Sequence, residues 1–280
     1  MEFYKFRARR LPIVTKGLID SILGRSGRVR VSFDMGISFT ELEVGDGLDV
    51  GGCWFSFDDL KGLRWEYVYA VLECRLWPVA FFKGKYFYKL YPVSPFDAPT
   101  LEISGIKMHR VVGITPWRDA ALKVDALKGL RGKRVLDICT GLGYTAIHAY
   151  RRGADVVSIE VDENVLDIAS YNPWSADLEN VNIVLGDAYE VVYEFDGGEF
   201  DAIIHDPPRF SLAGHLYSVD FYSELYRVLR RGGSLFHYAG KVGYRRRGID
   251  IIKGVASRLA RAGFRVRLMR DLRGVLAFKP

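Results

Sequence analysis

Between residues 134 and 210, four short apolar runs typical of buried strands alternate with segments of helical length. The acids at or directly after the ends of these runs are Asp137, Glu160, Asp187 and Asp206. Strands that alternate with helices form parallel sheets, and the carboxyl ends of parallel strands lie at one edge. The sequence therefore predicts that four acids gather at the edge where open α/β sheets bind ligands.

The same alternation continues to the end of the chain. Thr115 and Pro116 form a helix-start signal, because threonine caps helices and proline fits the first helical position. The predicted helices are 116–128, 144–152, 163–170, a short one ending at 193, 217–229 and 249–262. The predicted strands end at 138, 160, 186 and 205, and three more cover 234–238, 265–269 and 274–278. Residues 106–280 are therefore expected to form a doubly wound, Rossmann-like α/β sheet.

The first 105 residues have a different pattern. Alternating runs at 28–33, 39–44, 53–57 and 81–91 are separated by glycine-rich turns, which predicts short antiparallel strands. A short helix is expected within 13–23. Residues 58–77 fit either a helix or a strand, and the sequence leaves that choice open. We expect a smaller N-terminal antiparallel β domain over residues 1–105, with the boundary near residue 105.

Composition limits the class of protein. The chain has 280 residues, 49% of them hydrophobic, so it can bury a full core. No apolar run reaches the about 18 residues that span a membrane, and the charged start does not resemble a secretory signal, so we expect a cytosolic protein. Cys53, Cys74 and Cys139 are far apart in sequence without a C-x-x-C pair, so neither a disulfide framework nor a metal site is expected.

The net charge of +6 favours an anionic partner. Basic residues cluster at Arg7, Arg9 and Arg10, at Arg151 and Arg152, at Arg227, Arg230 and Arg231, and in the run from Lys241 to Arg247. Each cluster could be an ordinary solvated surface. The last run has glycines and a tyrosine among its basic residues and is the best candidate for contact with phosphates.

The glycine turn after the first strand of this region has two interpretations. Gly141, Gly143 and Ala146 satisfy the dinucleotide pattern G-x-G-x-x-G/A, which is a weak signal alone. However, three residues separate Asp137 from Gly141, and this D-x-x-x-G-x-G spacing resembles motif I of class I S-adenosylmethionine-dependent methyltransferases. The resemblance implies S-adenosylmethionine rather than NAD as cofactor. Its predicted contacts are Asp137, Thr140, Gly141, Gly143, Tyr144, Thr145, Glu160, Val161, Asp187, Ala188 and Asp206.

The sequence Asp206-Pro207-Pro208 resembles the D/N/S-P-P-Y/F tetrapeptide of methyltransferases that act on exocyclic amines of nucleic-acid bases. The lone pair of such an amine is delocalised into the ring, so acceptors must hold the nitrogen as it pyramidalises. The Asp206 carboxylate and the Pro207 carbonyl can be these acceptors, and prolines contribute no competing N–H. The match departs at the fourth place, where Arg209 stands and Phe210 follows. The predicted catalytic residues are Asp206, Pro207, Pro208 and Phe210.

The order D-P-P-x-F also resembles ribosomal RNA enzymes that methylate a ring carbon of cytosine, but that chemistry usually needs a cysteine nucleophile near this strand. No cysteine follows Cys139, which lies inside the glycine turn, so nitrogen is the favoured acceptor. His109, His205, His215 and His237 flank the proposed edge, and one of them could orient the base.

Segments from Ser104 to Lys241 resemble a family of archaeal class I methyltransferases with an added N-terminal β domain. The resemblance implies an RNA substrate, most specifically the amine of a cytidine in ribosomal RNA, and a role in RNA binding for the β domain. Two alternatives stay open. One is a polyamine aminopropyltransferase resembling spermidine synthase, which would use decarboxylated S-adenosylmethionine. The other is a non-catalytic RNA-binding module, which the four intact acids disfavour.

Overall fold

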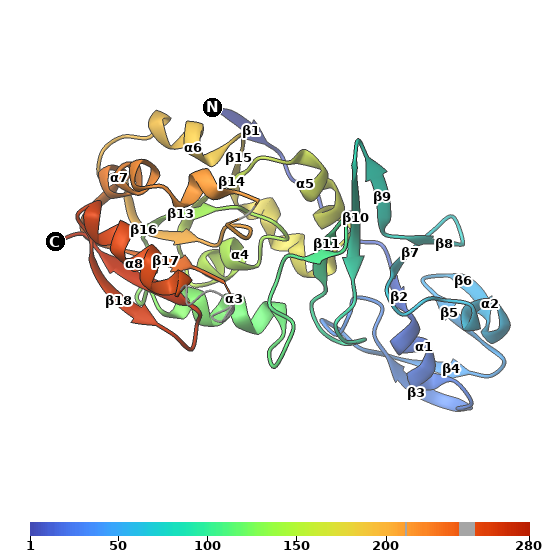
Figure 1. Cartoon of the computed structure of the whole chain (residues 1–280). Helices are drawn as coiled ribbons and strands as arrows, with labels where there is room; N and C mark the ends of the chain where they lie inside the picture. The colour runs from blue at the N-terminus through green and yellow to red at the C-terminus, as the bar shows by residue number, and fades with distance from the viewer. Residues whose placement is uncertain (211, 241–249) are drawn as a thin grey trace. The chain divides into compact units, whose positions relative to one another are not determined.

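The structure is a computed structural model that describes residues 1–210, 212–240 and 250–280 (Figure 1). The chain folds into two compact units. The first, here called the sheet unit, contains Met1–Phe6, Asp119–Glu163 and Leu178–Pro280. The second, the β-rich unit, contains Arg7–Arg118 and Asn164–Asp177. Neither unit is one continuous segment of sequence, and the expected domain boundary near residue 105 stays a prediction.

The sheet unit is built on eight strands in the order β1-β15-β14-β13-β16-β17-β19-β18. Its strands are β1 (Glu2–Tyr4), β13 (Arg134–Ile138), β14 (Asp155–Glu160), β15 (Asn182–Leu185), β16 (Phe200–His205), β17 (Leu229–Tyr238), β18 (Arg265–Met269) and β19 (Gly274–Phe278). The five strands from β15 to β17 are parallel, and β1, β19 and β18 are antiparallel to their neighbours. The expected α/β fold class is confirmed. The strand order reverses beside β13, which is where such sheets bind ligands.

Helices cover the parallel strands because their apolar residues recur on one face. In the sheet unit they are α3 (Pro116–Asp125, from Asp119 onward), α4 (Tyr144–Arg151), α6 (Ala188–Val191), α7 (Val219–Val228) and α8 (Ile251–Arg261), with 3₁₀ turns at Val192–Glu194 and Gly214–Tyr217. Helix α5 (Glu163–Ser170) and the 3₁₀ turn Pro173–Asn180 consist mostly of residues of the β-rich unit. In α7, Phe221, Tyr222, Leu225 and Val228 are buried, and the Ser218 side chain caps the helix by accepting from Phe221 N. The last helical residue is Val228, because Leu229 pairs with Phe200 and already belongs to β17.

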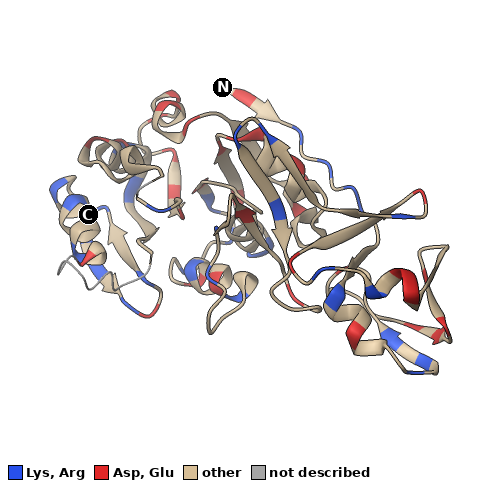
Figure 2. Cartoon of the chain, turned by 45° about the vertical axis from the view of Figure 1, so that its right-hand side comes forward, with Lys and Arg blue, Asp and Glu red and all other residues tan. Residues whose placement is uncertain are grey.

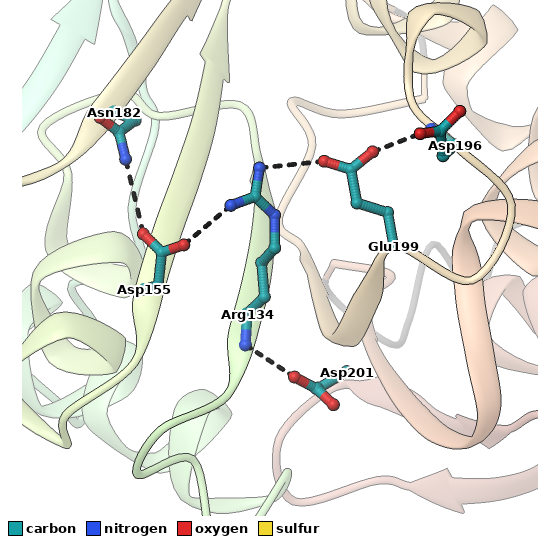
Figure 3. Close-up of polar contacts among 6 residues, drawn as sticks. All are labelled: Arg134, Asp155, Asn182, Asp196, Glu199 and Asp201. Carbon is teal, nitrogen blue, oxygen red and sulfur yellow. Dashed lines mark hydrogen bonds and ion pairs between the residues drawn. The ribbon is translucent and has the colours of Figure 1, made fainter.

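A polar network joins the amino ends of the parallel strands (Figure 3). The Arg134 guanidinium donates to Asp155 at 2.8 Å and to Glu199 at 2.9 Å, and its backbone N–H donates to Asp201 at 2.7 Å. These contacts link β13 to the starts of β14 and β16. The network lies at the edge opposite the four predicted acids, so we assign it to stability.

The β-rich unit contains four small antiparallel sheets, ordered β12-β11-β10-β9, β2-β7-β8, β3-β4 and β5-β6. The strands are β2 (Ile13–Thr15), β3 (Gly27–Val31), β4 (Thr40–Val44), β5 (Gly47–Val50), β6 (Cys53–Ser56), β7 (Val68–Leu72), β8 (Arg75–Pro78), β9 (Ala80–Lys83), β10 (Tyr86–Tyr91), β11 (Thr100–Ile103) and β12 (Ile106–Lys107). Helices α1 (Lys16–Ile22) and α2 (Phe57–Lys61) complete it. The ambiguous region 58–77 therefore contains both elements: its first residues belong to α2, and after a loop it forms β7 and most of β8. The expected helix within 13–23 begins only at Lys16, because Ile13–Thr15 pair with β7.

The expectation that the cysteines form no disulfide is wrong. Cys53 in β6 and Cys74 in the turn after β7 are bonded, with Cα atoms 5.1 Å apart. Sequence spacing did not reveal this pair because tertiary packing of the β-rich unit brings the two segments together. Within the described ranges, no helix is long and apolar enough to cross a membrane, and no cluster of three or more metal-binding side chains occurs. The expected cytosolic location stays a prediction.

Candidate active site at the carboxyl edge of the sheet

The four acids picked out in the sequence lie at the ends of neighbouring strands. Strands β15, β14, β13 and β16 are adjacent in that order. Asp137 is the penultimate residue of β13, and Glu160 is the last residue of β14. Asp187 comes two residues after the end of β15, and Asp206 directly follows β16. The edge therefore carries a row of carboxylates from four consecutive strands.

Asp137 is fully buried, and its two carboxylate oxygens have different surroundings. Ser158 donates to Oδ2 at 2.7 Å, whereas Oδ1 is buried and has no hydrogen-bond partner among the described residues. Burial raises the pKa of Asp137 to about 7, and the negative charges of Asp206 and Glu160 add to the rise, against hydrogen bonds from Ser158 and Thr145. A buried acceptor without a donor indicates a site for a polar ligand. Asp137 therefore fits a role in holding the ammonium group of S-adenosylmethionine.

The glycine turn leaves β13 and starts α4. Gly141 and Gly143 both have positive φ, +56° and +79°, which glycine adopts without strain. A Cβ at Gly143 would lie 2.5 Å from the Leu178 side chain, so no larger residue fits there. Thr140 is tied to the strand edge, since its hydroxyl lies 2.6 Å from that of Ser158. The turn brings backbone close to the acid row, as a cofactor loop must.

Glu160 is held by three backbone donors. Its Oε2 accepts from Gly141 N at 2.8 Å, and Oε1 accepts from Val161 N at 3.0 Å and Asp162 N at 3.1 Å. Burial raises the pKa of Glu160 to about 6, although these hydrogen bonds oppose the rise. An oriented carboxylate at the end of the second strand can accept from ribose hydroxyls.

Asp187 has two partners in the structure. It caps α6, accepting from Tyr189 N at 2.9 Å, and its Oδ1 lies 3.3 Å from His215 Nε2. Asp187 is therefore a helix cap, and a contact with adenine stays a proposal. The remaining predicted cofactor residues differ in exposure: Tyr144, Thr145 and Ala188 are buried, and Val161 is 65% exposed.

Asp206, whose side chain is 19% exposed, forms an ion pair with a buried lysine that the sequence did not predict. The Nζ atom of Lys123, on α3, lies 2.7 Å from Asp206 Oδ2 and 2.9 Å from Asp119 Oδ2. Nζ also lies 3.9 Å from the centre of the Tyr238 ring. Burial alone would lower the pKa of Lys123, but attraction to Asp206 and Asp119 outweighs it and raises the pKa, so the ammonium is charged. The sequence analysis identified neither Asp119 nor Lys123. Their spacing of four residues on a helix could have indicated an ion pair between them, but nothing in the sequence links either residue to Asp206.

The two prolines after Asp206 give the backbone a fixed course. Pro207 is buried, and the carbonyl of Pro208 accepts from the Tyr217 hydroxyl at 2.8 Å. Phe210 is 55% exposed, and its ring packs edge-on against Tyr217 with centroids 5.3 Å apart. Phe210 therefore presents an aromatic surface to solvent close to the Asp-Pro-Pro turn.

Two of the four histidines that flank the edge in sequence, His205 and His237, are core side chains. His205 and His237 are fully buried with ring centroids 4.2 Å apart. Burial lowers the pKa of both, that of His237 to about 3, so both are neutral core side chains. In the β-rich unit, His109 lies 2.9 Å from the Thr100 hydroxyl. Burial also raises the pKa of the Cys139 thiol well above its ordinary value, so Cys139 is no thiolate nucleophile.

Basic residues are spread along the chain and interleaved with acids (Figure 2). Arg9, one of the predicted phosphate contacts, is already engaged within the β-rich unit. It donates to Asp167 at 2.9 Å and to Ser170 at 3.0 Å, and it stacks 4.2 Å from the Tyr171 ring centre. The predicted basic run from Lys241 to Arg247 falls within 241–249, which lie outside the described residues.

Comparisons with known proteins identify a methyltransferase domain in this chain. Residues 135–233 match a methyltransferase domain family. Uncharacterized protein MJ1233 of Methanocaldococcus jannaschii is 49% identical over 230 residues, which are 80% of this chain and 78% of that protein. Ribosomal RNA large subunit methyltransferase I of Aeromonas hydrophila is 33% identical over 125 residues, 41% of this chain but 32% of that protein.

Among solved structures, a spermidine synthase in complex with the transition-state analogue AdoDATO has a TM-score of 0.57 at 19% identity and covers 71% of each chain. At this identity the similarity shows the fold alone. The matched methyltransferase domain, together with the strand order of the sheet, identifies a class I S-adenosylmethionine-dependent methyltransferase, whose cofactor is S-adenosylmethionine. The chain belongs to this class, in one family with MJ1233.

Proposed function

We propose that this methyltransferase modifies an exocyclic amine of a nucleic-acid base, and that its substrate is a cytidine in ribosomal RNA. The observation that carries the proposal is the position of Asp206-Pro207-Pro208. This tripeptide directly follows β16, next to the strand that carries Asp137. An acceptor group is thus adjacent to the proposed cofactor contacts, where methyl transfer would take place.

S-adenosylmethionine supplies an electrophilic methyl group to the neutral amine. In this proposal, Asp206 Oδ1 and the Pro207 carbonyl accept hydrogen bonds from the amine and hold its nitrogen as it changes from planar to pyramidal. Positive charge develops on that nitrogen, so acceptors oriented in advance stabilise the transition state more than the ground state. A strong base is not needed, because the nitrogen-bound proton becomes acidic as the bond forms.

The aromatic pair of Phe210 and Tyr217 supports a planar substrate. The half-exposed Phe210 ring lies a few residues from Asp206, and Tyr217 holds it edge-on. A base presented to Asp206 would be unpaired or flipped out of a helix, because a duplex hides its amine. We propose that Phe210 contacts the face of this base although it stands one place later than the usual motif residue.

RNA is proposed as the polymer for two reasons. The sequence similarity to ribosomal RNA large subunit methyltransferase I reaches 33% identity over the matched residues. The chain also carries a net charge of +6, which suits a polyanion. The β-rich unit is proposed to help hold the RNA strand.

Lys123 argues against a polyamine substrate. The Asp206 carboxylate that would attract a cationic amine is already paired with the Lys123 ammonium at 2.7 Å, and this pairing weakens its attraction for a polycation. Aminopropyl transfer therefore fits this site less well than methylation of an uncharged base, whatever the fold similarity to spermidine synthase.

The test supplies labelled S-adenosylmethionine with total RNA, DNA, protein extract or polyamines in separate reactions. A further polyamine reaction contains the decarboxylated cofactor. RNA products are digested and the modified nucleoside is identified by mass. Label on a base amine in RNA supports the proposal, and N4-methylated cytidine supports its narrower form. Label only in protein or DNA, or transfer only from the decarboxylated cofactor to a polyamine, contradicts it.

A variant at Asp206 tests the proposed chemistry. Asp206→Ala should lower turnover by about two orders of magnitude or more and leave cofactor affinity within a few-fold, because the acceptor matters chiefly in the transition state. Asp220→Asn, on the exposed start of α7, is the matched control and should behave like the native enzyme. Equal losses of cofactor binding and turnover would instead make Asp206 a cofactor ligand.

A further inference from the structure

We infer that Lys123 is a positioning residue for methyl transfer: its buried ammonium group fixes the Asp206 carboxylate in place and assigns its two oxygens to different tasks. The inference rests on the proposed role of Asp206 as the acceptor for the substrate amine. It concerns a residue from α3, outside the strand-end motifs of the sheet and outside the matched residues 135–233.

The geometry around Lys123 allows its ammonium group little freedom. The side chain is 5% exposed, and Nζ lies between Asp206 Oδ2 at 2.7 Å and Asp119 Oδ2 at 2.9 Å. The Tyr238 ring, on the strand next to β16, packs against the same ammonium at 3.9 Å. Two carboxylates and an aromatic ring therefore hold the cation, and the cation in turn holds Asp206.

The need for such a cation follows from the acid row. Asp206 interacts electrostatically with Asp137, which in turn interacts with Glu160. Adjacent buried carboxylates repel one another, and without a counter-charge one of them takes up a proton or turns away. Lys123 supplies the counter-charge from α3, with its ammonium group 2.7 Å from Asp206 Oδ2.

The pairing also fixes orientation. Because Lys123 binds Oδ2, rotation of the carboxyl group is restrained, and Oδ1 is left for the substrate amine. A reacting nitrogen must be held within a fraction of an ångström for in-line transfer, and a misplacement of about 1 Å can lower the rate by about 100-fold. Lys123 therefore acts through Asp206 and needs no contact with the substrate.

The experiment is a double-mutant cycle on the 280-residue chain, with total RNA as the methyl acceptor. Lys123→Met removes the charge but keeps much of the side-chain length, and Asp206→Asn removes the partner charge. We expect Lys123→Met to lower kcat by about 10- to 100-fold and to change the KM for S-adenosylmethionine by less than about threefold. In the Asp206→Asn background, Lys123→Met should cause little further loss, because the interaction it supports is already gone.

Two further variants guard against a purely structural effect. Lys123→Met leaves Asp119 buried without its cation, so Lys123→Met/Asp119→Asn is made in parallel to remove that uncompensated charge. It should fold like the native enzyme, as judged by thermal unfolding, and should still show the loss in kcat. Lys123→Arg keeps the positive charge and should recover part of the activity.

The outcomes separate this inference from the proposed function. If the native enzyme transfers no label to RNA, the proposed function fails before Lys123 is examined. If the native enzyme is active and a folded Lys123→Met/Asp119→Asn variant has native kcat, the inference is wrong. Equal fold losses from Lys123→Met in the native and Asp206→Asn backgrounds would also contradict it, because the lysine would then act independently of Asp206.

Discussion

Replacing Asp137 by asparagine should stabilise the cofactor-free enzyme while weakening its function. Asp137 is fully buried, and burial raises its pKa from an ordinary 3.8 to about 7. A carboxyl group with a raised pKa binds its proton more tightly in the folded state than in the unfolded state. Its charged form therefore opposes folding, and an isosteric neutral side chain should relieve this opposition.

The pH range follows from the two pKa values. Below about 3.8 the carboxyl group is protonated in both states and has no such effect. The destabilisation grows as pH rises from there and is complete above about 7. Each tenfold change in proton affinity corresponds to about 1.4 kcal/mol. The rise in pKa from 3.8 to about 7 therefore limits the destabilisation caused by ionised Asp137 to at most about 4 kcal/mol.

The expected gain is smaller than this ceiling, because asparagine changes the hydrogen bonds that Ser158 and Thr145 make to the carboxylate. We expect Asp137→Asn to raise the free energy of unfolding by about 2 kcal/mol at about pH 8, with a gain that shrinks toward zero near pH 4. A gain of this size would raise the melting temperature by about 5 °C. Affinity for S-adenosylmethionine should fall by at least about tenfold, because a charge-assisted contact to the ammonium is lost.

The assays are thermal unfolding of the cofactor-free enzyme at several pH values and calorimetric titration with S-adenosylmethionine. Asp220→Asn, on the exposed start of α7, controls for the loss of one surface charge and should show neither effect. A destabilised Asp137→Asn enzyme at about pH 8, or a gain that does not change with pH, would refute the reasoning about burial. Unchanged cofactor affinity would refute the assignment of Asp137 to the ammonium.

Three further outcomes are expected. Arg134→Ala removes the side-chain contacts to Asp155 and Glu199 (Figure 3). It should lower the free energy of unfolding by only about 1 kcal/mol, because the Arg134 side chain is 41% exposed, and calorimetry should find unchanged cofactor affinity. Gly143→Ala should lower the folding equilibrium constant and the affinity for S-adenosylmethionine, each by about tenfold or more, because the positive φ and the Leu178 contact both oppose a Cβ. Native cofactor affinity in this variant would contradict the assigned turn. Calorimetry with both ligands should detect S-adenosylmethionine binding and no NAD binding, and measurable NAD affinity alone would reverse the cofactor assignment.

The sequence by itself was enough for the features that depend on neighbouring residues. Strand-length apolar runs, the glycine turn and the acid after each run are local patterns, and parallel strands bring their carboxyl ends together whatever the details of packing. The row from Asp137 to Asp206 could therefore be predicted from residue spacing alone. The same locality explains why many helix and strand ends were close to their predicted positions. Among the exceptions, β17 begins at Leu229 rather than at 234, and α3 ends at Asp125 rather than at 128.

Tertiary structure decided the features that depend on which distant segments meet. The pairing of Lys123 with Asp206 joins residues 83 positions apart, and the Cys53–Cys74 bond depends on how β6 packs near the turn after β7. Burial was likewise decided by the tertiary structure. It lowers the pKa of His205, which makes this histidine a neutral core residue, and it raises the pKa of Asp137. Charge state and partner are set by the dielectric surroundings and by contacts across the fold, and neither is encoded in the spacing of residues along the chain.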